Sequence, residues 1–216
     1  MYVDPLVSRQ RKPRGQGASR RGEILEAAKR LFVTEGFEQT TIRRIAAAVG
    51  VSSAALYLYF PDKDAILRAI AESTFEALLA RLELSQRGGA SPEERFGAGL
   101  LAYVEFGRAH PDEYRLTFLA KMMTASGPGR PARPCEGIEA ADRSFGILQR
   151  GVEEMMAAGR IRPGDPTLTA EALWACLHGL TALLLDQTEH LASGPDALIE
   201  AVLGIALRGL RPDAAA

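Results

Sequence analysis

The chain has 216 residues, and its charges almost cancel, because 26 Lys and Arg stand against 27 Asp and Glu. Apolar residues make up 47% of the chain, which is ample for a packed core, and two cysteines are too few for a disulfide-based scaffold. The charge is unevenly distributed: residues 1–63 carry a net +5 and residues 64–216 a net −6. A basic N-terminal region on an acidic body favours a protein that orients itself on a polyanion.

Neither a signal peptide nor a membrane span is expected. The basic residues near the N-terminus are followed by no apolar segment, and the longest apolar stretch, residues 172–185, is shorter than the ~20 residues that a bilayer requires. We expect this stretch to be a buried helix. Together with the two cysteines, Cys135 and Cys176, these features indicate a reduced cytoplasmic compartment without membrane association.

The first 36 residues are expected to form an arm and a helix. Residues 1–20 are rich in Arg, Gly, Pro and Ser and are predicted to be a flexible arm, which either contacts DNA or is a solvated leader. Apolar positions at helical spacing predict a first helix over residues 21–35, and Gly36 ends it.

Residues 40–63 have the layout of a helix-turn-helix. Thr40 is the expected N-cap of a short helix whose apolar positions include Ile45, and Gly50 ends that helix. Ser52 caps a second short helix, which Pro61 stops. In a helix-turn-helix the second helix enters the DNA major groove. The alternative is a helix pair within a bundle that does not bind DNA.

Residues on the outer side of this motif are the candidate DNA contacts. Small residues at the start of the second helix allow a close approach to bases, while cations and phenols can bind phosphates. The candidates are Thr40, Thr41, Arg43, Arg44, Ser52, Ser53, Ala54, Tyr57, Tyr59 and Lys63.

The rest of the chain is predicted to be helical. Asp62 caps a long helix that leads from the DNA-binding region into the body, Ser91 and Pro92 begin another, and residues 124–136 form a surface loop. The expected helices cover residues 63–84, 92–110, a short segment around 114–123, 137–158, 167–188 and 195–210.

The last two of these helices are apolar around more than one face. A terminal helix normally has a solvated side, so we expect residues 167–188 and 195–210 to pair with a second copy in a four-helix interface. The alternative is that both are central to a single subunit. A twofold dimer would read a palindrome whose half-sites are about 34–36 Å apart, or a near multiple.

Several aromatic, Met and His residues of the body are candidates for lining a small-molecule site. Trp174 and His178 are four residues apart, so they share a helix face, and each brings a polar nitrogen into an apolar helix. The alternative is an ordinary core. The candidates are Tyr103, Phe106, Phe118, Met122, Phe145, Met155, Trp174 and His178.

Catalysis, a cofactor and a metal are not expected. The sequence has no Gly-rich phosphate loop, no paired catalytic carboxylates and no HExxH motif. Asp186, Glu189 and His190 are close in sequence, but three polar residues near a helix end are usually solvated.

The N-terminal pattern resembles the DNA-binding domain of the TetR family of bacterial transcriptional regulators. The resemblance rests on Ala27, Ala28, Leu31, Phe32, Gly36, Phe37, Thr40, Thr41, Ile42, Ile45, Ala46, Gly50, Val51, Ser52, Leu56, Tyr57, Tyr59, Phe60 and Lys63. Two positions depart from the family pattern: Ser53 stands where the family often has lysine, and Leu58 where it often has a polar residue. Trp174, His178 and Gly179 are similar to a Trp/His-Gly signature in one TetR subgroup.

The resemblance implies a homodimeric, all-α regulator of about nine helices, with a three-helix DNA-binding head and a larger bundle for ligand binding and dimerisation. The expected parts are a basic arm over residues 1–20, a helix-turn-helix domain over 21–66 and an effector-binding and dimerisation domain over 67–216. The expected function is repression at a palindromic operator, with release by an unknown small molecule. A chromosome-organising DNA-binding protein without an effector and an interaction-only helical protein are the alternatives.

Overall fold

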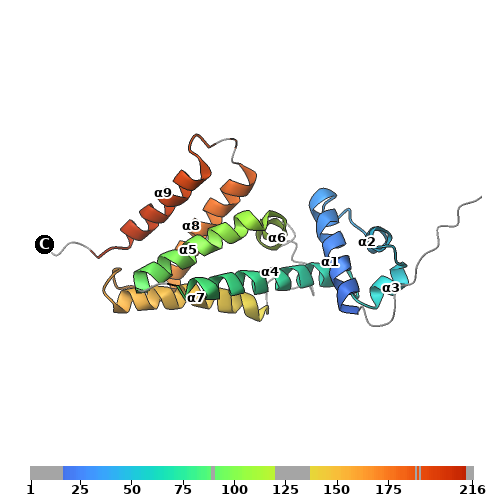
Figure 1. Ribbon diagram of the computed structural model, residues 1–216, viewed down its shortest axis with the longest axis horizontal. Helices are drawn as coiled ribbons and strands as arrows, with labels where there is room; N and C mark the ends of the chain where they lie inside the picture. The colour runs from blue at the N-terminus through green and yellow to red at the C-terminus, as the bar shows by residue number, and fades with distance from the viewer. Residues whose placement is uncertain (1–16, 89–90, 120–136, 188, 190, 213–216) are drawn as a thin grey trace, which may run out of the picture. The chain divides into compact units, whose positions relative to one another are not determined.

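The computed structural model describes residues 17–88, 91–119, 137–187, 189 and 191–212 (Figure 1). Its regular structure consists of nine α-helices and one π-helical segment, and the described residues include no strand. The predicted all-α class is therefore confirmed. The chain divides into two compact units between Ile66 and Leu67, and each is described separately below.

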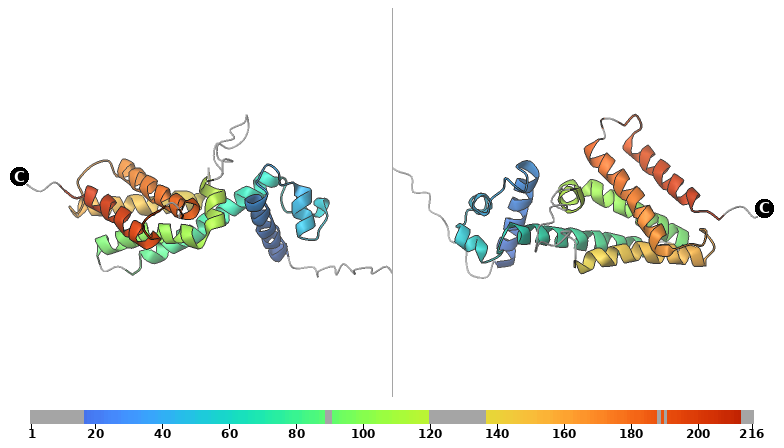
Figure 2. Two further views of the ribbon diagram at one scale, coloured as in Figure 1. Left: turned by 90° about the horizontal axis from the view of Figure 1, so that it is seen from above. Right: turned by 180° about the vertical axis from the view of Figure 1, so that it is seen from behind.

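The first unit contains three helices, α1 (Gly17–Thr34), α2 (Ile42–Ala48) and α3 (Ser53–Tyr57). α2 packs against both α1 and α3 (Figures 1 and 2). The apolar sides of the three helices enclose a small core. The fully buried members of that core include Ile24, Ala28, Ile45 and Leu56.

Two glycines set the corners of this unit. Gly36 follows α1 with φ +83°, and Gly50 lies between α2 and α3 with φ +69°. A residue with a Cβ atom is strained in this left-handed conformation, so glycine is the favoured residue at both turns.

The N-cap of α3 is the predicted residue, whereas the N-cap of α2 is not. The hydroxyl of Ser52 accepts a hydrogen bond from the backbone N–H of Ala55, as expected for the cap of α3. The cap of α2 is Thr41, which accepts from the N–H of Arg44 at 3.1 Å, so the prediction that Thr40 caps this helix is wrong. α3 ends at Tyr57, several residues before Pro61, which was expected to stop it.

α4 (Lys63–Ser85) begins in the first unit and continues into the second. The second unit also contains α5 (Pro92–Ala109), α6 (Pro111–Tyr114), the π-helical segment η1 (Arg115–Leu119), α7 (Glu139–Ala157), α8 (Pro166–Asp186) and α9 (Pro195–Gly209). α5, α7 and α8 pack against one another, and α9 packs against α8 (Figure 2).

Local signals begin most of these helices. Ser91 and Glu94 form a capping box at the start of α5, with Pro92 in the first turn. Asp165 accepts hydrogen bonds from the N–H groups of Thr167 and Leu168, and Pro166 begins α8. The predicted loop over residues 124–136 lies outside the described residues.

α8 is apolar and long enough to cross a membrane by length and composition, but it has a buried side and an exposed side. Its buried side, which includes Leu173, Leu177 and Leu180, belongs to the core of the second unit. In a single subunit the predicted buried helix is therefore buried on one side only.

Candidate nucleic-acid interface and ligand cavity

The end of α3 and the residues after it present an exposed surface. Tyr57, Leu58 and Tyr59 are 53%, 85% and 37% exposed, and Ala54 one turn before Tyr57 is also exposed. Ser53 is half-buried. A short helix with small residues at its start and phenol groups at its end can bring its backbone near base edges while the hydroxyls bind phosphates.

The two arginines of α2 differ in their contacts. The guanidinium of Arg44 forms a two-pronged pair with the Glu35 carboxylate, with Nη2–Oε1 and Nε–Oε1 distances of 2.7 and 3.1 Å. Hydrogen bonding to Arg44 lowers the pKa of Glu35, and the pKa of Arg44 rises in return. Arg43 is exposed and makes no ion pair with the part of the chain that the structure describes. Arg43 is therefore the more available of the two for a phosphate.

Two of the predicted DNA contacts are engaged inside the protein. Thr40 is only 1% exposed, and its hydroxyl lies 2.7 Å from the carbonyl of Gly36, so its side chain is not presented to a ligand. The Lys63 ammonium donates to the carbonyls of Phe37, Glu38 and Thr40 at 2.7, 3.3 and 3.4 Å and lies over the Phe37 ring. The expectation that Thr40 faces DNA is contradicted, and Lys63 instead ties the α1–α2 loop to the start of α4.

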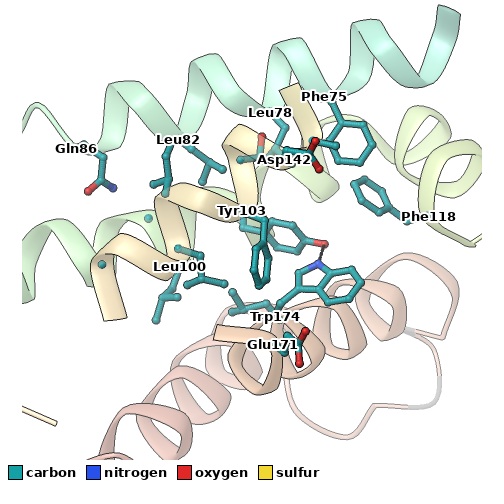
Figure 3. A pocket seen from close by; sticks show the side chains of 18 of the residues that line it. Phe75, Leu78, Leu82, Gln86, Leu100, Tyr103, Phe118, Asp142, Glu171 and Trp174 are labelled. Atoms are coloured by element: carbon teal, nitrogen blue, oxygen red, sulfur yellow. Dashed lines mark hydrogen bonds between the residues drawn. The ribbon is translucent and has the colours of Figure 1, made fainter. Parts of the chain in front are cut away.

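The second unit contains a cavity of about 790 Å³ that is partly open to solvent, and its walls come from α4, α5, η1, α7 and α8 (Figure 3). Its volume is in the usual range for small-molecule sites. Four of the predicted lining residues are in its wall: Tyr103, Phe118, Phe145 and Trp174.

Other predicted lining residues lie elsewhere. Phe106 and Met155 are buried in the core. His178 is half-buried beside the Trp174 ring and is not among the residues that line the cavity. Their apolar periodicity is that of core residues, which periodicity alone does not separate from lining residues. Met122 lies outside the described residues.

A chain of polar groups supports the cavity wall. The Trp174 Nε1–H donates to the Tyr103 hydroxyl at 3.3 Å, that hydroxyl lies 3.0 Å from the Tyr114 hydroxyl, and the latter lies 2.7 Å from Nδ1 of His178. Burial raises the pKa of both tyrosines and lowers the pKa of His178, so these groups are neutral near pH 7. The chain fixes the orientation of the rings and supplies the polar partners that Trp174 and His178 require.

Much of the apolar wall was not predicted from the sequence. Phe75, Leu78 and Leu82 of α4, and Phe96 and Leu100 of α5, all line the cavity. Apolar residues at helical spacing that face a cavity have the same period as those that face a core, so the sequence pattern does not separate the two.

The described residues hold no group of three or more His, Cys, Asp and Glu that could bind a metal ion. Asp186 is instead bonded to Arg115, with a Nε–Oδ1 distance of 2.8 Å. His190 lies outside the described residues.

Comparison with known proteins identifies the family. Residues 24–70 match the family described as "Bacterial regulatory proteins, tetR family", and residues 96–205 match "Tetracyclin repressor-like, C-terminal domain". The chain belongs to the TetR family. It is therefore a DNA-binding transcriptional regulator with the helix-turn-helix head and helical body of that family.

Relatives include both regulators and a nucleoid protein. The chain is 33% identical over 165 residues to nucleoid occlusion factor SlmA of Citrobacter koseri, which covers 75% of this chain and 81% of SlmA. The match to SlmA of Haemophilus ducreyi is 32% identical over 115 residues and spans about half of each protein, 53% of this chain and 55% of that relative. Among solved structures, the TetR family regulator PfmR of Thermus thermophilus is 26% identical with a TM-score of 0.68, covering 89% of this chain and 98% of PfmR.

Proposed function

We propose that this TetR family member is a repressor whose two copies bind a palindromic operator and are released when a small molecule occupies the cavity of the second unit. The cavity is the observation that carries this proposal. An apolar space of about 790 Å³, lined mainly by aromatic and aliphatic side chains with a few polar groups, is typical of a ligand site.

α4 supplies the connection between ligand and DNA. Its first residue, Lys63, is bonded to the loop before α2, and Phe75, Leu78 and Leu82 further along the same helix line the cavity. A ligand that favours one position of α4 changes the population of DNA-competent heads. Such coupling between two sites is typically worth 1–3 kcal/mol, or about 5–150-fold in operator affinity.

The operator-binding surface proposed here consists of Thr41, Arg43, Ser52, Ser53, Ala54, Tyr57 and Tyr59, with Arg44 available if its pair with Glu35 opens. Dimerisation through α8 and α9 would place two such surfaces on one duplex. This organisation divides the chain as the sequence suggested, with the DNA-binding domain over residues 21–66 and the effector-binding and dimerisation domain over 67–216. We infer that the protein acts in the cytoplasm, on the nucleoid, where an operator would lie.

The identity with SlmA favours a second candidate function, DNA binding that organises the chromosome without a small-molecule effector. The two functions share the head and differ in whether the cavity controls it. An interaction-only protein, the third possibility, would show no salt-sensitive binding to DNA.

A binding titration on the intergenic DNA next to the gene tests the proposal. We expect salt-sensitive binding by fluorescence anisotropy, and a loss of binding in the presence of compounds that change the fluorescence of Trp174, the only tryptophan of the chain. A cavity-filling change, Ala141→Phe, should leave operator binding intact but abolish release. Operator affinity that is unaffected by every compound that fills the cavity would favour the chromosome-organising function.

A further inference from the structure

A second groove of about 500 Å³ adjoins the cavity, and its chemistry is different. Four arginines and two glutamates line it, together with a few uncharged residues. The arginines are Arg87, Arg95, Arg143 and Arg150. This concentration of positive charge contrasts with residues 64–216 as a whole, which carry a net −6.

Two of the four arginines are paired. Arg143 binds Glu83 at 2.7 Å, and Arg95 binds Glu154 at 3.4 Å. Arg87 and Arg150 make no ion pair with any described residue, and both are exposed. The groove therefore has two guanidinium groups in excess over carboxylates, and a guanidinium fork binds phosphate or carboxylate oxygens in two-pronged fashion.

The groove and the cavity share three lining residues, so they adjoin. Gln86, Ile147 and Gly151 belong to both. Figure 3 shows Gln86 at one end of the cavity and Phe75, Phe118 and Trp174 toward the other. At the rise of an α-helix, the 11 residues from Phe75 to Gln86 correspond to about 16 Å. A long apolar body in the cavity would thus place its end beside the arginines.

Two carboxylates at the cavity suggest an alternative kind of ligand, a cation held by aromatic rings. Asp142 and Glu171 both line the cavity, but they come from α7 and α8 and lie on opposite sides of it (Figure 3). They do not converge on one point, whereas the four arginines line a single groove.

We propose that the ligand is an anionic amphiphile, with an apolar chain or ring system in the cavity and a phosphate or carboxylate head on Arg87 and Arg150. This proposal depends on the proposed function in one respect only: it takes the ligand to be the effector that releases the protein from its operator. The binding itself is a property of the second unit and is measured without DNA.

The test compares three probes that share one chain and differ in the head: dodecyl phosphate, dodecanol and dodecyltrimethylammonium. Each is titrated below its micelle-forming concentration, and binding is followed by Trp174 fluorescence. We expect dodecyl phosphate to bind about tenfold more tightly than dodecanol. Added salt should weaken the binding of dodecyl phosphate and leave the binding of dodecanol unchanged. Equal affinities, tighter binding of the cation, or no response to any of the three would overturn the proposal.

Matched variants test which arginines bind the anionic group of the ligand. The double change Arg87→Gln with Arg150→Gln should remove the roughly tenfold preference for dodecyl phosphate and leave dodecanol binding unchanged. Arg81→Gln is the control, because Arg81 is an exposed arginine of α4 that lines neither space. A preference for dodecyl phosphate that survives the double change would contradict the assigned head site.

Operator binding, measured on the same preparations, separates this proposal from the proposed function. If dodecyl phosphate binds at the arginines but never affects operator affinity, the ligand class stands and release by a ligand fails. If release occurs only with cationic or neutral compounds, the proposed function stands and the anionic class fails.

Discussion

Residues of one charge type have separate roles in the head, and their contacts show which role each has. Lys63 donates to three backbone carbonyls, whereas Arg43 has an exposed guanidinium without an ion pair among the described residues. A cation that is already bonded within the fold contributes to stability. One that faces solvent beside the recognition helix remains available for a phosphate.

Lys63→Ala should therefore lower the stability of the head by about 1–3 kcal/mol, because three carbonyl acceptors lose a charged donor. Arg43→Ala is the matched change: it should leave stability unaltered, weaken operator binding evenly across sequences and reduce the salt slope by about 1. Stability is measured by urea unfolding with circular dichroism, since Trp174 lies in the other unit. An unchanged unfolding midpoint for Lys63→Ala would contradict the role given to its ammonium group.

At the scale of elements, α5 and α8 approach each other closely where Gly107 lies. A Cβ added to Gly107 would stand 2.3 Å from the Thr181 methyl and 3.1 Å from the Tyr114 ring. Gly97, in the same helix, has no atom within 4 Å of the corresponding position. The two glycines therefore separate close packing from helix propensity within one element.

Gly107→Ala should destabilise the protein by about 1–3 kcal/mol through overpacking. Gly97→Ala should stabilise it by about 0.5–1 kcal/mol, because alanine is the better helix former and meets no neighbour. Unfolding of both variants is followed in urea by the fluorescence of Trp174, which lies on α8. Equal effects of the two changes would show that the approach of α5 to α8 is less close than described.

The elements themselves were largely predictable from the sequence, because caps and turns are local. Gly36, Gly50, Ser52 and the Ser91–Pro92 pair mark helix ends as expected. The Thr40–Thr41 pair was ambiguous, since either hydroxyl is a good cap and only tertiary packing buries Thr40.

The cavity was only partly predictable. Whether Phe75 faces a space or Phe106 faces a neighbour depends on how far apart the helices lie, and periodicity carries no information on that distance. The polar chain from Trp174 to His178 needs Tyr103 and Tyr114, which are distant in sequence.

At the scale of the whole molecule, α8 and α9 expose an apolar surface that no other part of the described chain covers. Uncharged residues at helical spacing form one exposed face of α8, and exposed residues of α9 include Ile205, which is 65% exposed. The exposed face of α8 consists of Leu168, Ala172, Ala175, Cys176, Gly179 and Leu183. Small and apolar residues over two adjacent helices are typical of a surface that a second copy covers.

Ile205→Arg should convert the dimer to a monomer, because a charge placed in an apolar interface would lose its water without a partner. We expect the dissociation constant of the dimer to rise by about 100-fold or more, as measured by analytical ultracentrifugation. Leu84→Arg is the control, since Leu84 is also an exposed apolar residue, at 60%, but belongs to α4 and not to α8 or α9.

Cys176 provides an independent test of the proposed interface, because it lies on the exposed face of α8. With Cys135 changed to Ser, Cys176 should react slowly with iodoacetamide in the dimer and faster once Ile205→Arg separates the subunits. The monomer should also lose most of its operator affinity, since a palindrome read by one head offers only half of the contacts. If Ile205→Arg stays dimeric with Cys176 protected, the subunits must associate through another surface, and the spacing of the two heads would have to be derived anew.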